Sequence, residues 1–127
     1  MTKGAVIYEK GKPEVFKWEN IDVPDPKFDE VLIKNTAVGV NYIDTYHRRG
    51  MPHPWPVPDL PIVLGIEGVG IVEDIGSDIN DFKKGDRVAY ALPPHGAYSQ
   101  KRVYPAKKLI KVPNDLTNFS DNDLAAL

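Results

Sequence analysis

The side chains best suited to chemistry in this sequence lie close together, in the segment GVNYIDTYHRRG between Gly39 and Gly50. The segment combines an amide, a carboxylate, two phenols and two guanidinium groups. Such groups can orient a polar ligand, stack on a planar ring and stabilise negative charge on an oxygen. In a helix, Tyr42 and Tyr46 would share one face at the i, i+4 spacing, with Arg49 over Thr45. The segment therefore predicts one wall of a ligand-binding cleft.

Two neighbouring elements are expected to hold this segment in place. Residues 30–40 contain a short apolar run that is typical of a buried strand. Asn41 is a favoured N-cap residue and Gly50 a favoured C-terminal stop, so we predict a helix of about two turns between them. Five prolines follow within residues 52–61 and are expected to make the next stretch rigid.

The composition limits the class of protein. The 127 residues are 42% hydrophobic and 27% charged, as expected for one globular domain rather than a disordered chain or a membrane span. A net charge of -2 argues against a nucleic-acid partner, and the lack of cysteine excludes disulfides and thiolate-bound metals. Because the chain does not open like a secretory signal, we expect a cytoplasmic protein without membrane contact.

Short β-branched and aromatic runs recur along the chain with turn residues between them. This pattern predicts an all-β barrel or sandwich in which helix is a minor component. The first two runs are joined by a turn at residues 11–13 and are expected to form a hairpin. The predicted strands are residues 3–9, 15–23, 30–40, 71–75, 88–92, 96–104 and 109–112.

The stretch GIEGVG at residues 65–70 looks like a dinucleotide-binding fingerprint. That fingerprint requires a helix after the glycines, whereas this sequence continues with a short β-branched run. We therefore predict glycines inside a strand or bulge, where another backbone approaches closely, and no phosphate site.

The last residues read as the beginning of a helix. Ser120 and Asp123 have the spacing of a capping box, followed by the run LAAL. A helix this short is marginal in isolation, so we expect residues 120–127 to be the start of a longer helix and the chain to be the N-terminal part of a longer protein.

The runs GVNYIDTYHRRG, GIEGVGIVEDIG, KKGDRVAY, GAYSQ and YPAKKLIKVPNDL occur here in the order and spacing of a known family. The chain resembles the N-terminal, GroES-like domain of the zinc-free medium-chain dehydrogenases/reductases, in the NADPH:quinone oxidoreductase (zeta-crystallin-like) branch. The resemblance covers nearly all of residues 1–127 and implies an all-β fold, a GroES-like partly open β-barrel with short helices. It also implies a following Rossmann cofactor domain and a homodimeric complete enzyme.

The resemblance assigns roles to the segment after the predicted strand. In the family this segment lines the cleft where NADPH meets the substrate. Tyr46 and Arg48 match positions on the substrate side and are implied to be catalytic, the ring stacking on a quinone or related conjugated carbonyl and the cation meeting its oxygen. The implied cofactor-binding residues are Asn41, Tyr42, Ile43, Asp44, Thr45 and Tyr46.

The resemblance also predicts that no metal is bound. Zinc-dependent relatives carry a cysteine where this chain has Asn41 and a histidine where it has Ile66, so both ligands are missing. His47 and His53 have no third ligand in view, which argues against a separate metal site. Quinone reductases often carry an aromatic residue at the position of Pro52, which leaves the identity of the substrate open.

Structural roles compete with some of these assignments. Asp44 is expected to interact with the helix dipole or to pair with Arg48, in preference to acting in catalysis. For Tyr42, the alternative to cofactor binding is a role in core packing alone. Replacing Arg48 is expected to change stability as little as a surface substitution does. The basic residues near the C-terminus are expected to form a solvated face; they are Lys101, Arg102, Lys107, Lys108 and Lys111.

A second class of function stays open at this point. The chain could be a free-standing GroES-like binding module without catalysis. A reading frame that continues into a strand, a glycine-rich fingerprint and a helix would favour the enzyme, and a frame that ends at Leu127 would favour the module.

Overall fold

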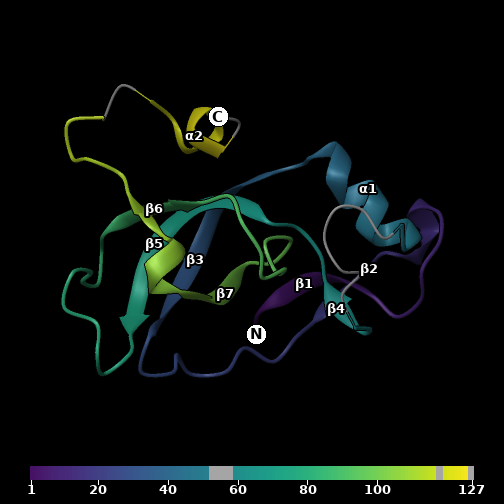
Figure 1. Ribbon diagram of the computed structural model, residues 1–127, viewed down its shortest axis with the longest axis horizontal. Coiled ribbons are helices and arrows are strands. Elements are labelled where there is room, and N and C mark those ends of the chain that lie inside the picture. Colours follow the sequence, from purple (N-terminus) through teal and green to yellow (C-terminus); the bar gives the residue numbers. More distant parts are fainter. Residues whose placement is uncertain (52–58, 117–118, 126–127) are drawn as a thin grey trace.

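The computed structural model describes residues 1–51, 59–116 and 119–125. These residues form eight short strands, two short α-helices and two 3-10 turns (Figure 1). The predicted all-β class, a partly open barrel with short helices, is confirmed. In chain order the elements are β1 (Lys3–Ile7), η1 (Pro13–Val15), β2 (Lys17–Asn20), β3 (Glu30–Gly39), α1 (Tyr42–Arg49), β4 (Ile62–Val63), β5 (Glu67–Ile75), β6 (Arg87–Tyr90), β7 (Lys101–Pro105), η2 (Ala106–Lys108), β8 (Ile110–Lys111) and α2 (Asp121–Ala125).

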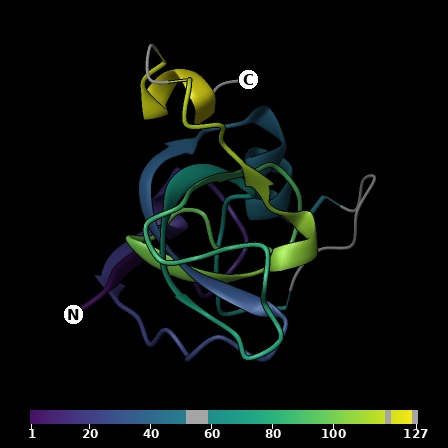
Figure 2. The same cartoon turned by 90° about the vertical axis from the view of Figure 1, so that its left-hand side faces the viewer.

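The strands are arranged in two antiparallel sheets. The smaller has the order β2-β1-β4, so the predicted hairpin of the first two strands is confirmed. The larger has the order β7-β3-β5-β6-β8. An isolated bridge between Gly4 and Ser99 joins β1 to the chain before β7. In Figure 2 the strands curve around a common interior, as the partly open barrel requires.

Strand β3 has 10 residues, and more and less buried positions alternate along it, as expected of a strand with one face on the core. The core cluster contains Val31 and Ile33 from β3 together with Val72, Val88 and Tyr90. Strand β3 pairs with β5 from Val31 to Gly39, with two register shifts. This register places Gly39, the last residue of β3, opposite Glu67, the first residue of β5.

The glycines of β5 confirm the interpretation of the GIEGVG stretch. Residues 67–75 form one continuous strand with no helix after it. A Cβ at Gly70 would lie 2.4 Å from the carbonyl oxygen of Lys34, and a Cβ at Gly68 would lie 2.6 Å from the hydroxyl of Tyr90. These glycines are therefore required for close packing within the sheet.

The predicted strand at residues 96–104 begins later than expected, at Lys101. Gly96 has a φ of 139°, which favours glycine and interrupts an extended strand. The N–H groups of Gly96 and Ala97 both donate to the carbonyl of Gly65, and that of Tyr98 donates to the carbonyl of Leu64. Residues 96–98 therefore bind the chain before β5 instead of extending β7.

One basic residue of the predicted solvated face is buried. Arg102 is 5% exposed, and its guanidinium lies between the rings of Tyr90 and Tyr104, 4.9 and 4.7 Å from their centroids. It also donates to the carbonyls of Pro94 and His95. The expectation was wrong for Arg102, because alternation along β7 turns it inward with Tyr104.

Helix α2 begins as predicted. The N–H of Ser120 donates to the Asp123 carboxylate at 3.0 Å, and the N–H of Asp123 donates to Ser120 Oγ at 3.1 Å, which completes the capping box. The helix packs on β3 and β5. None of the described helices is long and apolar enough to cross a membrane.

Candidate active site

The candidate site is built at the junction where β3 ends and α1 begins. Asn41 has extended backbone angles at the N-cap position, and Gly50 has a φ of 80° at the C-cap. The predicted helix and both of its ends are therefore confirmed. The N–H of Gly50 donates to the carbonyl of His47, which satisfies one of the last carbonyls of the helix.

Asp44 holds the start of this helix from the inside. Its side chain is 4% exposed, and its Oδ2 accepts hydrogen bonds from the backbone N–H of Asn41 at 3.0 Å and from the hydroxyl of Tyr98. Burial, together with the hydrogen bond to Asp44, raises the pKa of Tyr98. Asp44 therefore lies in the first turn of α1, where an interaction with the helix dipole was expected, and it also caps the helix. The alternative expectation, a pair with Arg48, is wrong, because among the described residues Asp44 forms no ion pair with Arg48.

The side chain of Asn41 is held by a second carboxylate. Its Nδ2 donates to Oε1 of Glu67 at 3.1 Å. The two carboxylates thus fix the backbone and the amide of one residue from two different elements. Gly39 permits this approach, since a Cβ there would lie 1.9 Å from Glu67 Oε1.

Asn41 and Glu67 line a polar cavity of about 370 Å³ between the end of β3 and helix α2. Asn122 and Ala125 of α2 complete its wall with the residues at the end of β3. The cavity can hold a ring-sized polar ligand, and the amide and carboxylate on its wall can hydrogen-bond one. Its remaining lining residues are Val38, Gly39 and Val40.

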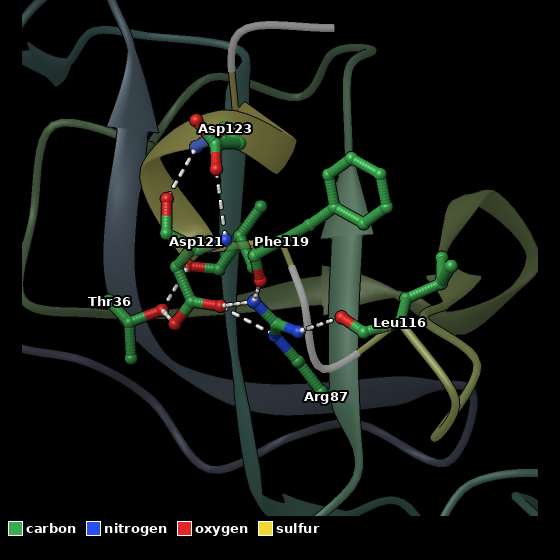
Figure 3. Close-up of polar contacts among 8 residues, drawn as sticks. Thr36, Arg87, Leu116, Phe119, Asp121 and Asp123 are labelled. Carbon is green, nitrogen blue, oxygen red and sulfur yellow. Dashed lines mark hydrogen bonds and ion pairs between the residues drawn. The ribbon is translucent and has the colours of Figure 1, made fainter.

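A polar cluster keeps α2 against this cavity (Figure 3). Arg87 of β6 donates from Nε to Asp121 at 2.5 Å, and from its two terminal nitrogens to the carbonyls of Leu116 and Phe119. The second oxygen of Asp121 accepts from the hydroxyl of Thr36 in β3. Burial raises the pKa of Asp121, but the hydrogen bonds from Thr36 and Arg87 outweigh it, so the pKa lies below its ordinary value. Helix α2 is therefore tied to both β3 and β6.

Asn41 also lines a second, smaller cavity of about 150 Å³. Oδ1 of Asp44 is buried without a hydrogen-bond partner among the described residues. This cavity could therefore accept a small donor group. Its lining residues are Phe16, Val40, Asn41, Asp44, Thr45, Arg48 and Tyr98.

Arg48 is buried, not at the surface as expected. It is 9% exposed, and its Nε donates to the carbonyl of Gly11 at 3.0 Å. Tyr46 is half-buried and packs edge-on against Tyr42, with 5.5 Å between ring centroids. Positions 46 and 48 are about 200° apart around a helix, so the two residues predicted to be catalytic lie on opposite faces of α1.

The remaining predicted site residues lie on both sides of the helix. Tyr42 is 73% exposed, which contradicts a core position, and Ile43 and Thr45 are half-buried. Thr45 donates from its hydroxyl to the carbonyl of Tyr42. The structure therefore brings Asn41, Asp44 and Thr45 to one cavity and leaves the ring of Tyr42 in solvent.

The buried face of α1 carries a histidine pair. His47 is 1% exposed and its ring lies edge-on to that of His95, with 4.4 Å between centroids. Burial and the neighbouring charges of His47 and Arg102 lower the pKa of His95 to about 4, and burial lowers that of His47. His53 lies outside the described residues. Within the described ranges, no three histidine, aspartate or glutamate side chains are grouped as a metal site would need.

Glu67 and Tyr98 were not identified from the sequence. Each is distant along the chain from the residue that it holds, and Glu67 is opposite the end of β3 only because of the β3–β5 register. A local signal existed for Glu67, since a carboxylate between Gly65 and Gly68, directly before a β-branched run, is unusual.

Comparison with known proteins identifies the family. The model of the alcohol dehydrogenase GroES-like domain matches residues 27–114, which is more than half of the chain. The chain belongs to this family. Among curated relatives of the GroES-like chain, a 2-haloacrylate reductase from Burkholderia sp. is 52% identical over all 127 residues, and a quinone oxidoreductase from Pseudomonas aeruginosa is 45% identical over 116 residues.

Solved structures show the same similarity. A 2-haloacrylate reductase gives a TM-score of 0.86 at 49% identity over 97% of this chain. The quinone oxidoreductase of Escherichia coli, solved as a complex with NADPH, gives a TM-score of 0.86 at 36% identity over 97% of this chain. The GroES-like chain spans 38% and 35% of the length of the two curated relatives, and 35% and 36% of the two solved chains.

Proposed function

We propose that this GroES-like chain is the substrate-side domain of an NADPH-dependent oxidoreductase that passes hydride to a quinone or a related conjugated carbonyl compound, without zinc. The observation that carries the proposal is the polar cavity at the β3–α1 junction, with Asn41 and Glu67 on its wall. The similarity to a 2-haloacrylate reductase and to quinone oxidoreductases supports the same class of reaction.

The cavity suits one end of the cofactor. Its polar lining groups are amides and a carboxylate, which can hydrogen-bond a neutral carboxamide or a ribose hydroxyl. Among the described residues that line it there is no lysine or arginine, so the cavity does not suit the phosphates. We propose that a Rossmann domain following this one holds the phosphates, since the GIEGVG stretch leads directly into strand β5 and not into a helix.

When bound, NADPH would supply a hydride, which carries two electrons and one proton. The acceptor would take a second proton from solvent. The work left to this chain is to bind and orient. Asn41 would hydrogen-bond a carbonyl oxygen in the cavity, and Tyr46 would offer a ring on which a planar acceptor can stack. The sequence-based roles of Tyr46, Arg48 and the cofactor-binding residues 41–46 stay predictions.

The proposal of a zinc-independent reaction rests on the residues at the two positions where zinc-dependent relatives carry ligands. The side chain of Ile66 has no atom that can bind zinc. The Nδ2 of Asn41 carries hydrogens and donates a hydrogen bond to Glu67. Elemental analysis of untagged protein should give far less than one zinc per chain. A stoichiometric zinc ion would overturn this part of the proposal.

The test of the proposed function is NADPH oxidation by the complete gene product, with a quinone and a 2-haloacrylate as alternative acceptors. We expect turnover with at least one of them. The 127-residue chain alone should turn over neither and should bind NADPH more weakly than low micromolar. Turnover by the complete product with neither acceptor would favour a GroES-like binding module. The predicted homodimer and cytoplasmic location also stay predictions.

A further inference from the structure

The hydrogen bond between Asn41 and Glu67 determines how the Asn41 amide can be used. An ionised carboxylate only accepts hydrogen bonds, so the atom of Asn41 that faces Glu67 at 3.1 Å must be the amide nitrogen and not its oxygen. Without such a partner, an asparagine side chain can exchange the positions of its nitrogen and oxygen by rotation about its Cβ–Cγ bond. Glu67 therefore selects one of the two orientations.

One amide hydrogen is left over by this arrangement. The Nδ2 group carries two hydrogens, and among the described residues only Glu67 accepts from it. Asn41 also lines the polar cavity with Glu67. The second N–H is thus a donor that nothing in the described part of the chain consumes.

The carboxylate of Glu67 cannot easily move away from Asn41. Gly39 leaves it just enough room, and Glu67 begins β5, whose backbone is paired with β3 on one side. Asp44 holds the backbone of Asn41 independently, from helix α1. A residue fixed at both its backbone and its side chain loses little conformational entropy when a ligand binds.

We propose that Glu67 is a positioning residue, which orients the Asn41 amide so that its second N–H donates to a carbonyl oxygen bound in the polar cavity. The carbonyl belongs either to the nicotinamide carboxamide or to the acceptor that is reduced. The identity of the ligand rests on the proposed function. The orientation of Asn41 does not depend on it.

The orientation is tested on the 127-residue chain by NMR of the Asn41 side-chain amide, assigned by its loss in Asn41→Asp. Glu67→Ala should move the chemical shift of the bonded amide hydrogen towards that of a free asparagine amide and speed the exchange of the amide hydrogens with solvent about tenfold or more, as expected when a hydrogen bond is lost. Glu67→Gln keeps an acceptor oxygen and should retain most of the protection. Glu73→Ala is the control, because Glu73 lies on the same strand and pairs with Lys101 instead. Unchanged Asn41 signals in Glu67→Ala would overturn the proposal.

The use of the oriented N–H is tested on the complete enzyme. If the nicotinamide carbonyl is the partner, Glu67→Ala should weaken the Kd of NADPH about tenfold; if the acceptor is the partner, kcat/KM for the acceptor should fall about tenfold with the Kd unchanged. Glu67→Gln should rescue either loss in part. If the NMR effect is present while both quantities stay at wild-type values, the positioning role is overturned. If the complete enzyme neither binds NADPH nor reduces an acceptor, the proposed function fails, and the orientation of Asn41 is judged by NMR alone.

Discussion

Arg48 and Gly11 bind each other through two hydrogen bonds. The Nε of Arg48 donates to the carbonyl of Gly11 at 3.0 Å, and the N–H of Gly11 donates to the carbonyl of Arg48 at 3.0 Å. These contacts connect the end of α1 to the loop between β1 and β2. A cation that is used in this way contributes to the fold, and this contact competes with the catalytic role implied by the family resemblance.

Replacing Arg48 should therefore reduce stability. Arg48→Ala leaves the Gly11 carbonyl without its side-chain donor and removes a buried stem, so the free energy of unfolding should fall by about 1–3 kcal/mol. Arg49→Ala is the control on the same helix, at an exposed position, and should change it by less than about 0.5 kcal/mol. Urea unfolding measures both. A stable Arg48→Ala variant with a reduced kcat/KM would restore the catalytic role and contradict the structural one.

Asp44 supports the helix start and Tyr98 at the same time. Asp44→Ala removes the acceptor for the N–H of Asn41 and leaves the Tyr98 hydroxyl without its partner. We expect a loss of about 1–3 kcal/mol in the free energy of unfolding, and a smaller loss for Tyr98→Phe, which removes only the donor. Equal stability of Asp44→Ala and wild type in urea unfolding would show that the cap contributes nothing.

Features that depend on residues close together in the sequence could be predicted, and features that depend on contacts between distant segments could not. The ends of α1 at Asn41 and Gly50, and the capping box of α2, obey local rules and were predicted from the sequence. The contacts of Arg48 with Gly11 and of Asn41 with Glu67 join separate elements, so they depend on a register that local pattern does not contain. Arg102 is intermediate: strict alternation would have placed it on the inward face with Tyr104.

The histidine pair predicts a pH dependence of stability. The folded-state pKa of His95 is lowered to about 4, below the ordinary value of 6.5, so unfolding takes up a proton between these values. Its contribution to stability is complete above about pH 6.5 and is lost as the pH falls towards 4. Burial also lowers the pKa of His47, although the charge of Asp44 opposes this shift. Besides His47, Arg102 is the charged neighbour that lowers the pKa of His95.

Urea unfolding between pH 8 and pH 4.5 measures this effect. His95→Phe keeps a ring against His47 and should flatten the decrease in stability relative to wild type. Because carboxylates also titrate near the lower limit, the difference between the two proteins is the quantity to compare. A difference that does not change with pH would contradict the assignment to His95.

Gly39 should be needed for the site rather than for the strand. A Cβ there would meet Glu67 Oε1 at 1.9 Å and the carbonyl of Ala125 at 2.7 Å, so Gly39→Ala should displace Glu67 from Asn41. We expect NADPH binding or acceptor reduction by the complete enzyme to weaken as in Glu67→Ala. Gly85→Ala is the control: it has a φ of 94° but nothing within 4 Å of its Cβ, so it should cost stability of about 1–2 kcal/mol without changing binding. Normal NADPH binding and normal acceptor reduction by the Gly39→Ala enzyme would contradict this role of Gly39.

Tyr46 should act through its ring. Tyr46→Phe keeps the stacking surface, so kcat/KM should fall only a few-fold, whereas a hydroxyl that donates to a developing oxyanion would be worth about 3 kcal/mol. Tyr42→Phe is the control, because Tyr42 packs on Tyr46 and is otherwise exposed. Steady-state kinetics of the complete enzyme distinguishes these cases.

The most direct measurement of the central claim is a crystal structure of the complete enzyme with NADPH and an acceptor analogue. The account predicts a carbonyl oxygen of the nicotinamide or of the analogue within about 3.2 Å of Asn41 Nδ2, with the bond from Nδ2 to Glu67 intact. A complex in which neither carbonyl enters the polar cavity, or an Asn41 amide that has turned its oxygen towards Glu67, would contradict it.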